Sequence, residues 1–405
     1  LVDKVKKLEE EWRKLKEELD LTRHERNIIS EKINKAKKEG KSIKDLIIKA
    51  KNIPLEIKKL EERTSFLEKE IRNIMLLIPN IISPQTPIGK DESENKEIKR
   101  VGKIPKFDFP VKNHVELSEK LDLTDFDASA KVSGNGFYYL KKELALLNQA
   151  LIRFTIDFMK KKGYEYIETP LMLKEKAIFA SMDKEAIANS VYSIEGEDLN
   201  LIGTSEQSLL AMHSNQIIQE SELPKKYFSY SMCFRKEIGA HGINEKGLWR
   251  THQFNKIEQF IFCRPEDSTK LYDELLQNSE EILKTLELPY RILEICSGDL
   301  SDWKYRSADL EVYRPTTKNY GEVMSLSNCT DYQARKLNIR CINGIGEKRI
   351  LHTLNNTAMA TSRILVTLME NNQQKDGSIK IPRALWKYSG FKIIKAKKLK
   401  KRKKN

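Results

Sequence analysis

The first 78 residues carry apolar side chains in a heptad pattern that is interrupted only once. One apolar seam covers Leu8–Ala36 and a second covers Leu46–Ile78, with Gly40 between them. Seams of this kind are typical of helices that pack side by side in a coiled coil. The short glycine-containing break predicts that the chain turns back on itself. We therefore expect an antiparallel helical hairpin, kinked or broken locally where Pro54 removes a backbone donor.

The turn of this hairpin is rich in lysine. Eight lysines and only two acids lie between Lys32 and Lys51. Contacts to nucleic-acid phosphates need cations rather than base-reading side chains, so this turn is a candidate site for RNA. A solvated charged face is the alternative interpretation. The candidate phosphate contacts are Lys32, Lys35, Lys38, Lys41 and Lys44.

Two aromatic-rich runs, 226–237 and 249–262, flank a segment that contains three glycines. This composition predicts two antiparallel strands joined by a long loop over 238–248. Alternate side chains of a strand share a face, and a guanidinium beside an aromatic ring suits phosphate and base. A solvated, salt-bridged face is the alternative. The residues that share the face are Arg235, Glu237, Arg250, His252, Phe254, Lys256 and Glu258.

These runs resemble motif 2 of the class II aminoacyl-tRNA synthetases. The likeness is carried by Phe-Arg-Lys-Glu at 234–237 and Arg-Thr-His-Gln-Phe at 250–254. The continuation His-Gln-Phe-Asn-Lys-Ile-Glu at 252–258 is similar to the version found in seryl-tRNA synthetases. A match of this length favours a nucleotide site over a solvated face.

Other segments extend the resemblance along the chain. A helix predicted at 141–162, followed by 163–170, is similar to motif 1, which implies a homodimer interface. Thr204-Ser205-Glu206 is similar to the serine-specific segment of the family. The run 354–357, with a helix expected from Ala358 to Gln373, is similar to motif 3.

The resemblance implies an α+β fold with an N-terminal antiparallel coiled-coil arm. The catalytic part is expected to be an antiparallel sheet of about six to eight strands flanked by helices. We expect the arm at 1–83, a proline-rich linker at 84–105, the class II catalytic domain at 106–391 and a basic disordered tail at 392–405. Because the sequence begins at Leu1 rather than at methionine, we also expect residues upstream.

The implied activity is that of a seryl-tRNA synthetase. L-serine and ATP would form seryl-adenylate and pyrophosphate, and the seryl group would pass to the 3′ end of tRNA(Ser); tRNA(Sec) is a further substrate that the sequence leaves open. The implied catalytic residues are Arg235, Glu258 and Arg363. The implied serine contacts are Thr204, Ser205, Glu206, Arg235, Glu258 and Thr357. The implied ATP contacts are Arg235, Lys236, Glu237, Arg250, Phe254, Glu322, Val323, Met324, Ser325 and Arg363, with Mg²⁺ held by Glu322 and Ser325.

Composition indicates the partner and the cellular compartment that this activity would have. The net charge of +14 suits a polyanionic partner such as tRNA. The five cysteines are scattered without a Cys-x-x-Cys pair, which fits a reducing cytoplasm and the zinc-free subtype of the family. No apolar run reaches the length of a membrane span, so no membrane association is expected.

Three other functions stay open at this point. The first is a catalytically inactive, RNA-binding or regulatory paralogue, which would have lost motif arginines or substrate carboxylates. The second is a ligase that charges a carrier protein, although such proteins lack the helical arm. The third is a structural coiled-coil protein, which would need a seam that continues past Gly40.

Overall fold

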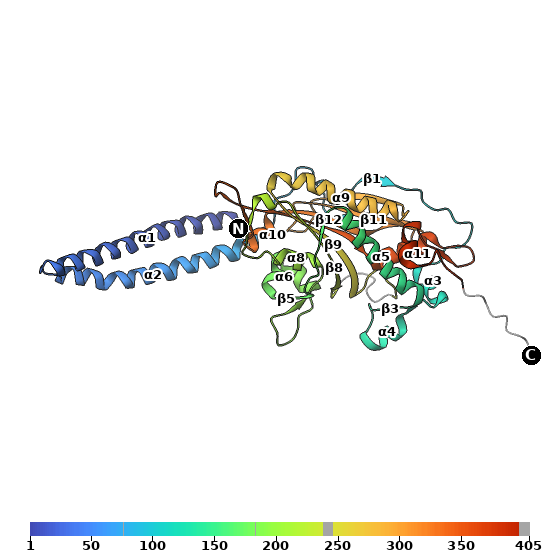
Figure 1. Ribbon diagram of the computed structural model, residues 1–405, viewed down its shortest axis with the longest axis horizontal. Helices are drawn as coiled ribbons and strands as arrows, with labels where there is room; N and C mark the ends of the chain where they lie inside the picture. The colour runs from blue at the N-terminus through green and yellow to red at the C-terminus, as the bar shows by residue number, and fades with distance from the viewer. Residues whose placement is uncertain (76, 183, 238–245, 397–405) are drawn as a thin grey trace, which may run out of the picture. The chain divides into compact units, whose positions relative to one another are not determined.

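The computed structural model describes residues 1–75, 77–182, 184–237 and 246–396 (Figure 1). The chain forms two compact units, Leu1–Pro79 and Asn80–Asn405. Within the described ranges, no helix is long and apolar enough to cross a membrane.

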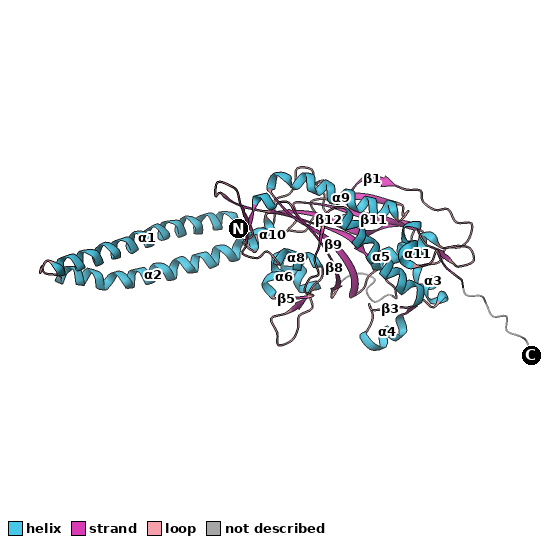
Figure 2. Cartoon of the chain, viewed as in Figure 1, coloured by secondary structure: helices cyan, strands magenta, loops and turns pink. Residues whose placement is uncertain are grey.

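The first unit is the predicted helical hairpin. Helix α1 (Val2–Lys38) lies beside α2 (Lys44–Met75), as Figure 2 shows. The predicted seam residues form its core, including Leu19, Ile29, Ile53, Ile57 and Leu60. Ion pairs such as Arg63–Glu11, at 2.5 Å, join the two helices beside that core. Helix α2 continues through Pro54, so the proline does not break the helix.

The second unit is built on an eight-stranded sheet in the order β1-β10-β11-β12-β15-β9-β8-β4. All neighbouring strands are antiparallel except β4 and β8, which are parallel. The α+β prediction is therefore confirmed. The bounds are β1 Lys96–Val101, β4 Glu165–Tyr166, β8 Lys225–Phe234, β9 Gln253–Cys263, β10 Tyr290–Glu294, β11 Arg306–Arg314, β12 Asn319–Thr330 and β15 His352–Ala360.

Long helices pack on this sheet and enclose the main core. Helix α5 (Lys142–Lys161) buries Leu144, Leu147 and Leu151, which the sequence pattern placed on one face. Helices α9 (Ser268–Thr285) and α11 (Thr361–Asn372) complete the core with α3 (His114–Leu121). The smaller helices are α4 Phe126–Ser133, α6 Glu175–Ser181, α7 Lys184–Ser190, α8 Ser205–Ala211, α10 Tyr332–Lys336 and α12 Trp386–Ser389.

Short strands form four further sheets at the periphery of the described fold. They are β2 Thr124–Asp125 with β3 Tyr139–Leu140, β5 Met172–Leu173 with β6 Asn200–Leu201, β7 Ile217–Gln219 with β13 Arg340–Ile342 and β14 Lys348–Ile350, and β16 Ile379–Lys380 with β17 Ile393–Ile394. Single-turn 3₁₀ helices lie at Glu92–Glu94, Glu220–Glu222, Pro265–Asp267 and Arg383–Leu385.

The structure differs from the expected boundaries in three places. The expected linker contains β1, which pairs with β10 as an edge strand, and Asn80 N already donates to Asp302 O within the second unit. The expected tail begins inside the fold, because β17 pairs with β16; residues 397–405 lie outside the described part. The helix of the motif 3 region begins at Thr361 rather than Ala358, because β15 stays paired with β9 as far as Ala360.

Candidate active site

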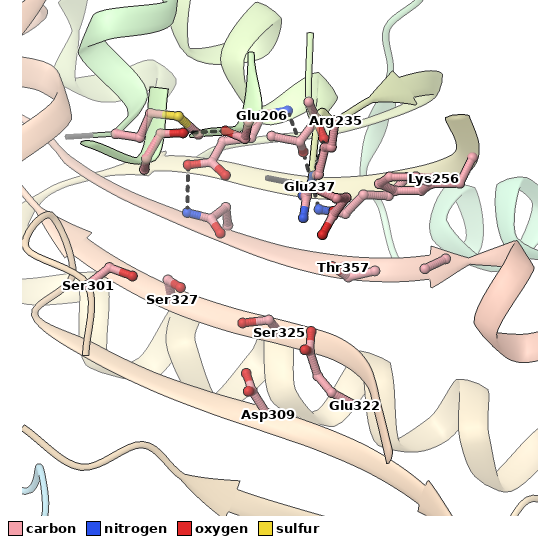
Figure 3. A pocket seen from close by; sticks show the side chains of 18 of the residues that line it. Glu206, Arg235, Glu237, Lys256, Ser301, Asp309, Glu322, Ser325, Ser327 and Thr357 are labelled. Carbon is pink, nitrogen blue, oxygen red and sulfur yellow. Dashed lines mark hydrogen bonds between the residues drawn. The ribbon is translucent and has the colours of Figure 1, made fainter. Parts of the chain in front are cut away.

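One cavity of about 590 Å³ collects most of the side chains predicted to bind substrates (Figure 3). Its floor is formed by β9, β11, β12 and β15, and its walls by the segments that follow β6 and β8. The predicted residues that line it are Thr204, Glu206, Arg235, Glu237, Arg250, Phe254, Glu322, Val323, Ser325, Thr357 and Arg363.

The hairpin of β8 and β9 supplies the face predicted to hold a nucleotide. The guanidinium carbon of Arg235 lies 5.3 Å from the ring centroid of Phe254, and Arg235 Nε donates to Gly203 O at 3.2 Å. Arg250 donates to Glu237 Oε2 at 2.7 Å. Glu237 has a φ of +52°, a left-handed conformation that a non-glycine residue adopts only when its surroundings hold it there. Most of the predicted loop, 238–245, lies outside the described residues.

Some predicted side chains do not line this cavity. His252 Nδ1 lies 2.9 Å from Arg235 O, and its ring contacts Phe137. Lys236 Nζ lies over the ring of Tyr192. Ser205 donates to Ser229 O, and the side chain of Met324 is buried in the core.

Two glutamates form an acidic end of the site. Glu206 Oε1 accepts hydrogen bonds from Gln333 at 2.7 Å and Asn355 at 3.0 Å. Glu258 is 1% exposed and lies behind the lining, where it pairs with Lys256 and accepts from Thr204 at 3.1 Å. A buried carboxylate needs such partners, so this end is a built polar network rather than a solvated face.

The electrostatics of this end favour a cationic ligand. Burial of the carboxyl, together with the charge of Glu258, raises the pKa of Glu206 to about 7. A positive group placed between the two carboxylates would relieve that repulsion and lower the pKa again. The site is thus suited to an ammonium group with a nearby hydroxyl.

A second acidic cluster lies beside the arginine of the motif 3 region. Arg363 NH1 pairs with Glu322 Oε2 at 3.1 Å, while Asp309 and Ser325 are direct partners across β11 and β12. Burial and the charge of Glu322 raise the pKa of Asp309 to about 7. The Oδ1 atom of Asp309 is buried and accepts no hydrogen bond from the described residues.

Several lining residues had no role predicted from the sequence. Asp309 carries no local sequence signal, because it meets the predicted Ser325 only through the pairing of β11 with β12. Lys256 was placed on the correct face but without a role, although it alternates with Phe254 and Glu258. Trp249 and Lys304 also line the cavity, and no local pattern marks either of them.

Together these groups can bind an anion, a base and an amine in one enclosure. Arg235 (Figure 3) and Arg363 supply guanidinium groups from different elements. Preorganised cations of this kind stabilise charge that develops on a transferring phosphoryl group. The arrangement therefore suits the joining of an amino acid to a nucleotide phosphate.

Two family models match the chain. Residues 190–372 match the class II core domain of tRNA synthetases of the G, H, P, S and T types. Residues 1–82 match the N-terminal domain of seryl-tRNA synthetases.

Individual proteins match over nearly the whole chain. The serine–tRNA ligase of Pyrococcus furiosus is 44% identical to this chain. The alignment covers 97% of this chain and 91% of the relative. The solved seryl-tRNA synthetase of Pyrococcus horikoshii, complexed with ATP, gives a TM-score of 0.91 at 40% identity and covers 98% of this chain and 94% of its own. The cytoplasmic serine–tRNA ligase of Naegleria fowleri, in complex with AMP, gives 0.86 at 36% identity, with coverage of 98% and 92%.

Proposed function

The chain belongs to the seryl-tRNA synthetase family, and we propose that its cavity activates L-serine with ATP and passes the seryl group to tRNA(Ser). The observation that carries the proposal is the convergence of Arg235, Phe254 and Glu206 on one cavity. The inactive paralogue is disfavoured because the motif arginines and both substrate carboxylates are present.

In the first step the serine carboxylate attacks the α-phosphorus of ATP, and pyrophosphate leaves. Arg235 holds the α-phosphate as negative charge grows on it, and Arg363 holds the γ-phosphate. Phe254 stacks on the adenine ring, and Glu237 accepts a hydrogen bond from the adenine amino group. The contribution of the protein is mainly positioning and charge neutralisation.

Serine is recognised at the acidic end of the cavity. Glu206 binds the ammonium group, whose charge offsets the mutual repulsion of the two glutamates. The serine hydroxyl and the remaining N–H groups of its ammonium form hydrogen bonds with Glu258, Thr204 and Thr357. Lys256, which pairs with Glu258 and donates to Thr204 Oγ1 at 3.2 Å, holds that buried carboxylate in place.

The donor set beside Arg363 fits a hard cation bound together with ATP. Glu322 and Ser325 would hold Mg²⁺, and the buried Oδ1 of Asp309 adds an oxygen of the kind that this ion prefers. When bound, the ion supplies positive charge to the phosphate oxygens. Arg363, already paired with Glu322, orients that carboxylate.

In the second step a terminal ribose hydroxyl of tRNA attacks the carbonyl carbon of the adenylate. The helical hairpin is assigned to tRNA binding through its exposed lysines around Gly40. These lysines offer phosphate contacts and no base-reading groups, which suits recognition of tRNA by shape.

The protein is assigned to the cytoplasm as a homodimer, with the interface formed by the catalytic unit. Leu146 of α5 is 55% exposed and Met172, just after the motif 1 region, is 49% exposed, so this part of the catalytic unit offers apolar surface for a partner copy. All five cysteines are free and buried, which suits a reducing compartment.

The experiment that tests the proposed function is ATP–pyrophosphate exchange with serine, threonine and alanine compared side by side. Serine should support exchange and the other two should not, because only the serine hydroxyl satisfies the buried polar groups without a clash. Equal exchange with alanine, or none with serine, would overturn the assignment.

A further inference from the structure

A buried carboxylate lies behind the phosphate end of the cavity and has no role in the activity above. Glu370 is 0% exposed and lies on α11, two helical turns after Arg363 and on the same side of the helix. Its carboxylate accepts from Arg314 at 3.1 Å and from Thr316 at 2.8 Å. A charge buried with this many donors is fixed in one position.

His114 connects this carboxylate to the end of the glycine-rich loop. Its Nδ1 lies 3.3 Å from Glu370 Oε1, and its Nε2 accepts the backbone N–H of Leu248 at 3.1 Å. A ring nitrogen that accepts from an N–H carries no proton, so the proton of the neutral ring is on Nδ1 and is donated to Glu370. The imidazole therefore joins two elements in a single tautomer.

The next residue, Trp249, lines the cavity, and two arginines contact its ring. The guanidinium carbon of Arg314 is 4.2 Å from the indole centroid, and that of Arg363 is 5.5 Å from it. The indole lies on Gly321, where any added Cβ would come within 2.4 Å of the ring. Gly321 and the two arginines therefore restrict the position of the indole ring.

Arg363 depends on the backbone of the same segment. Its Nε donates to Trp249 O at 3.3 Å, and its NH1 donates to Glu322 O at 2.9 Å. A shift of 248–249 would move both the ring beneath the guanidinium and the carbonyl that receives its hydrogen bond. The orientation of Arg363 is therefore set in part by the amide of Leu248 and its partner His114.

We propose that His114 is a positioning residue for ATP: it holds Leu248 and Trp249 so that Arg363 faces the outer phosphates. His114 touches no substrate and acts through the segment that it anchors. The inference rests on the proposed function, since it concerns the ATP-activating step, and it adds a residue outside the three motifs. It also assigns Gly321 and Arg314 to the support of Trp249.

The test is a pair of substitutions that separate the two ring nitrogens. His114→Asn keeps a donor near the position of Nδ1 but has no atom that reaches Leu248. His114→Gln places an amide oxygen near the position of Nε2, where it can accept from Leu248. In ATP–pyrophosphate exchange, His114→Asn should raise KM for ATP about fivefold, the effect of one ordinary hydrogen bond, while KM for serine stays unchanged.

His114→Gln should stay within about twofold of the wild type in KM for ATP. Thermal unfolding of both variants, with ATP binding measured by equilibrium dialysis below both midpoints, separates positioning from a loss of stability. Equal KM values for ATP in the two variants, or a parallel rise in KM for serine, would overturn the inference. An absence of exchange in the wild type would instead overturn the proposed function, and dialysis would still report whether His114 affects ATP binding.

Discussion

The guanidinium of Arg235 lies over the ring of Phe254, with its central carbon 5.3 Å from the ring centroid. Arg235 follows β8 and Phe254 is the second residue of β9, so the hairpin itself creates this contact. In the proposed function the two side chains serve the α-phosphate and the adenine ring of one ATP molecule. The contact thus sets the distance between the groups that hold the two ends of AMP.

Replacing the ring should weaken ATP binding selectively. Phe254→Leu removes the stacking surface and should raise KM for ATP about threefold to tenfold, because aromatic stacking contributes about 0.5–1.5 kcal/mol beyond area burial. KM for serine should stay near the wild-type value. Phe254→Tyr is the matched control and should keep most of the affinity; a similar loss in both variants would argue against stacking.

Serine binding should depend on pH through Glu206. Burial and the charge of Glu258 raise the pKa of Glu206 to about 7, and the serine ammonium needs the ionised carboxylate. Serine affinity should therefore rise as pH increases from about 6 to about 8 and level off above that range. Below a pH of about 7 the dissociation constant should change by roughly tenfold per pH unit.

Calorimetric titration of serine across this pH range measures the effect. Glu206→Gln should bind serine weakly and lose the dependence on pH. The exposed Glu195→Gln is the control and should keep it. A pH profile that is unchanged in Glu206→Gln would assign the titration to another group.

Much of the fold follows from local patterns in the sequence. The heptad seams predict the hairpin because only a/d positions can be buried between two helices, and Leu19 and Ile57 are indeed buried there. The strand alternation around Arg235 and Phe254 predicts a shared face for the same reason. These predictions need only the spacing of apolar and polar residues along the chain and the composition of short segments.

The rest depends on pairing between distant segments. Asp309 faces Ser325 because β11 and β12 pair in one register, which neither strand encodes alone. Strand β1 looked like a linker because it is an exposed edge strand whose polar residues resemble a loop. His114 and Glu370 are 256 positions apart, so no local pattern could connect them.

The lysines around the turn of the helical hairpin should affect tRNA charging and not serine activation. Replacing Lys32, Lys35, Lys38, Lys41 and Lys44 with glutamine should lower kcat/KM for tRNA and leave ATP–pyrophosphate exchange unchanged. The salt dependence of tRNA binding should weaken by about 0.7–0.9 in log–log slope for each phosphate that the protein no longer neutralises. The matched control replaces Lys4, Lys6, Lys7, Lys58 and Lys69 on the same two helices. Equal effects of both sets, or a fall in exchange, would contradict a separate role for the turn.

A charge on the exposed apolar face of α5 should weaken the homodimer. Leu146→Glu places a carboxylate where the proposed interface is apolar, and desolvating it would cost about 1–3 kcal/mol or more per subunit. Sedimentation velocity should show a shift from dimer toward monomer. Ile345→Glu, at a side chain that is 87% exposed on the β13–β14 turn, is the control and should remain dimeric. A fully dimeric Leu146→Glu would place the interface elsewhere.

The most direct test of the central claim is serine-dependent ATP–pyrophosphate exchange by Arg235→Ala. The proposed role of Arg235 at the α-phosphate predicts a loss of roughly 10²–10³-fold in kcat, as for the removal of one preorganised donor at a developing charge. Arg349→Ala, which removes an arginine paired with Glu266 on the surface, should exchange at the wild-type rate. Normal exchange by Arg235→Ala would contradict the assignment of this cavity as the site where serine is activated.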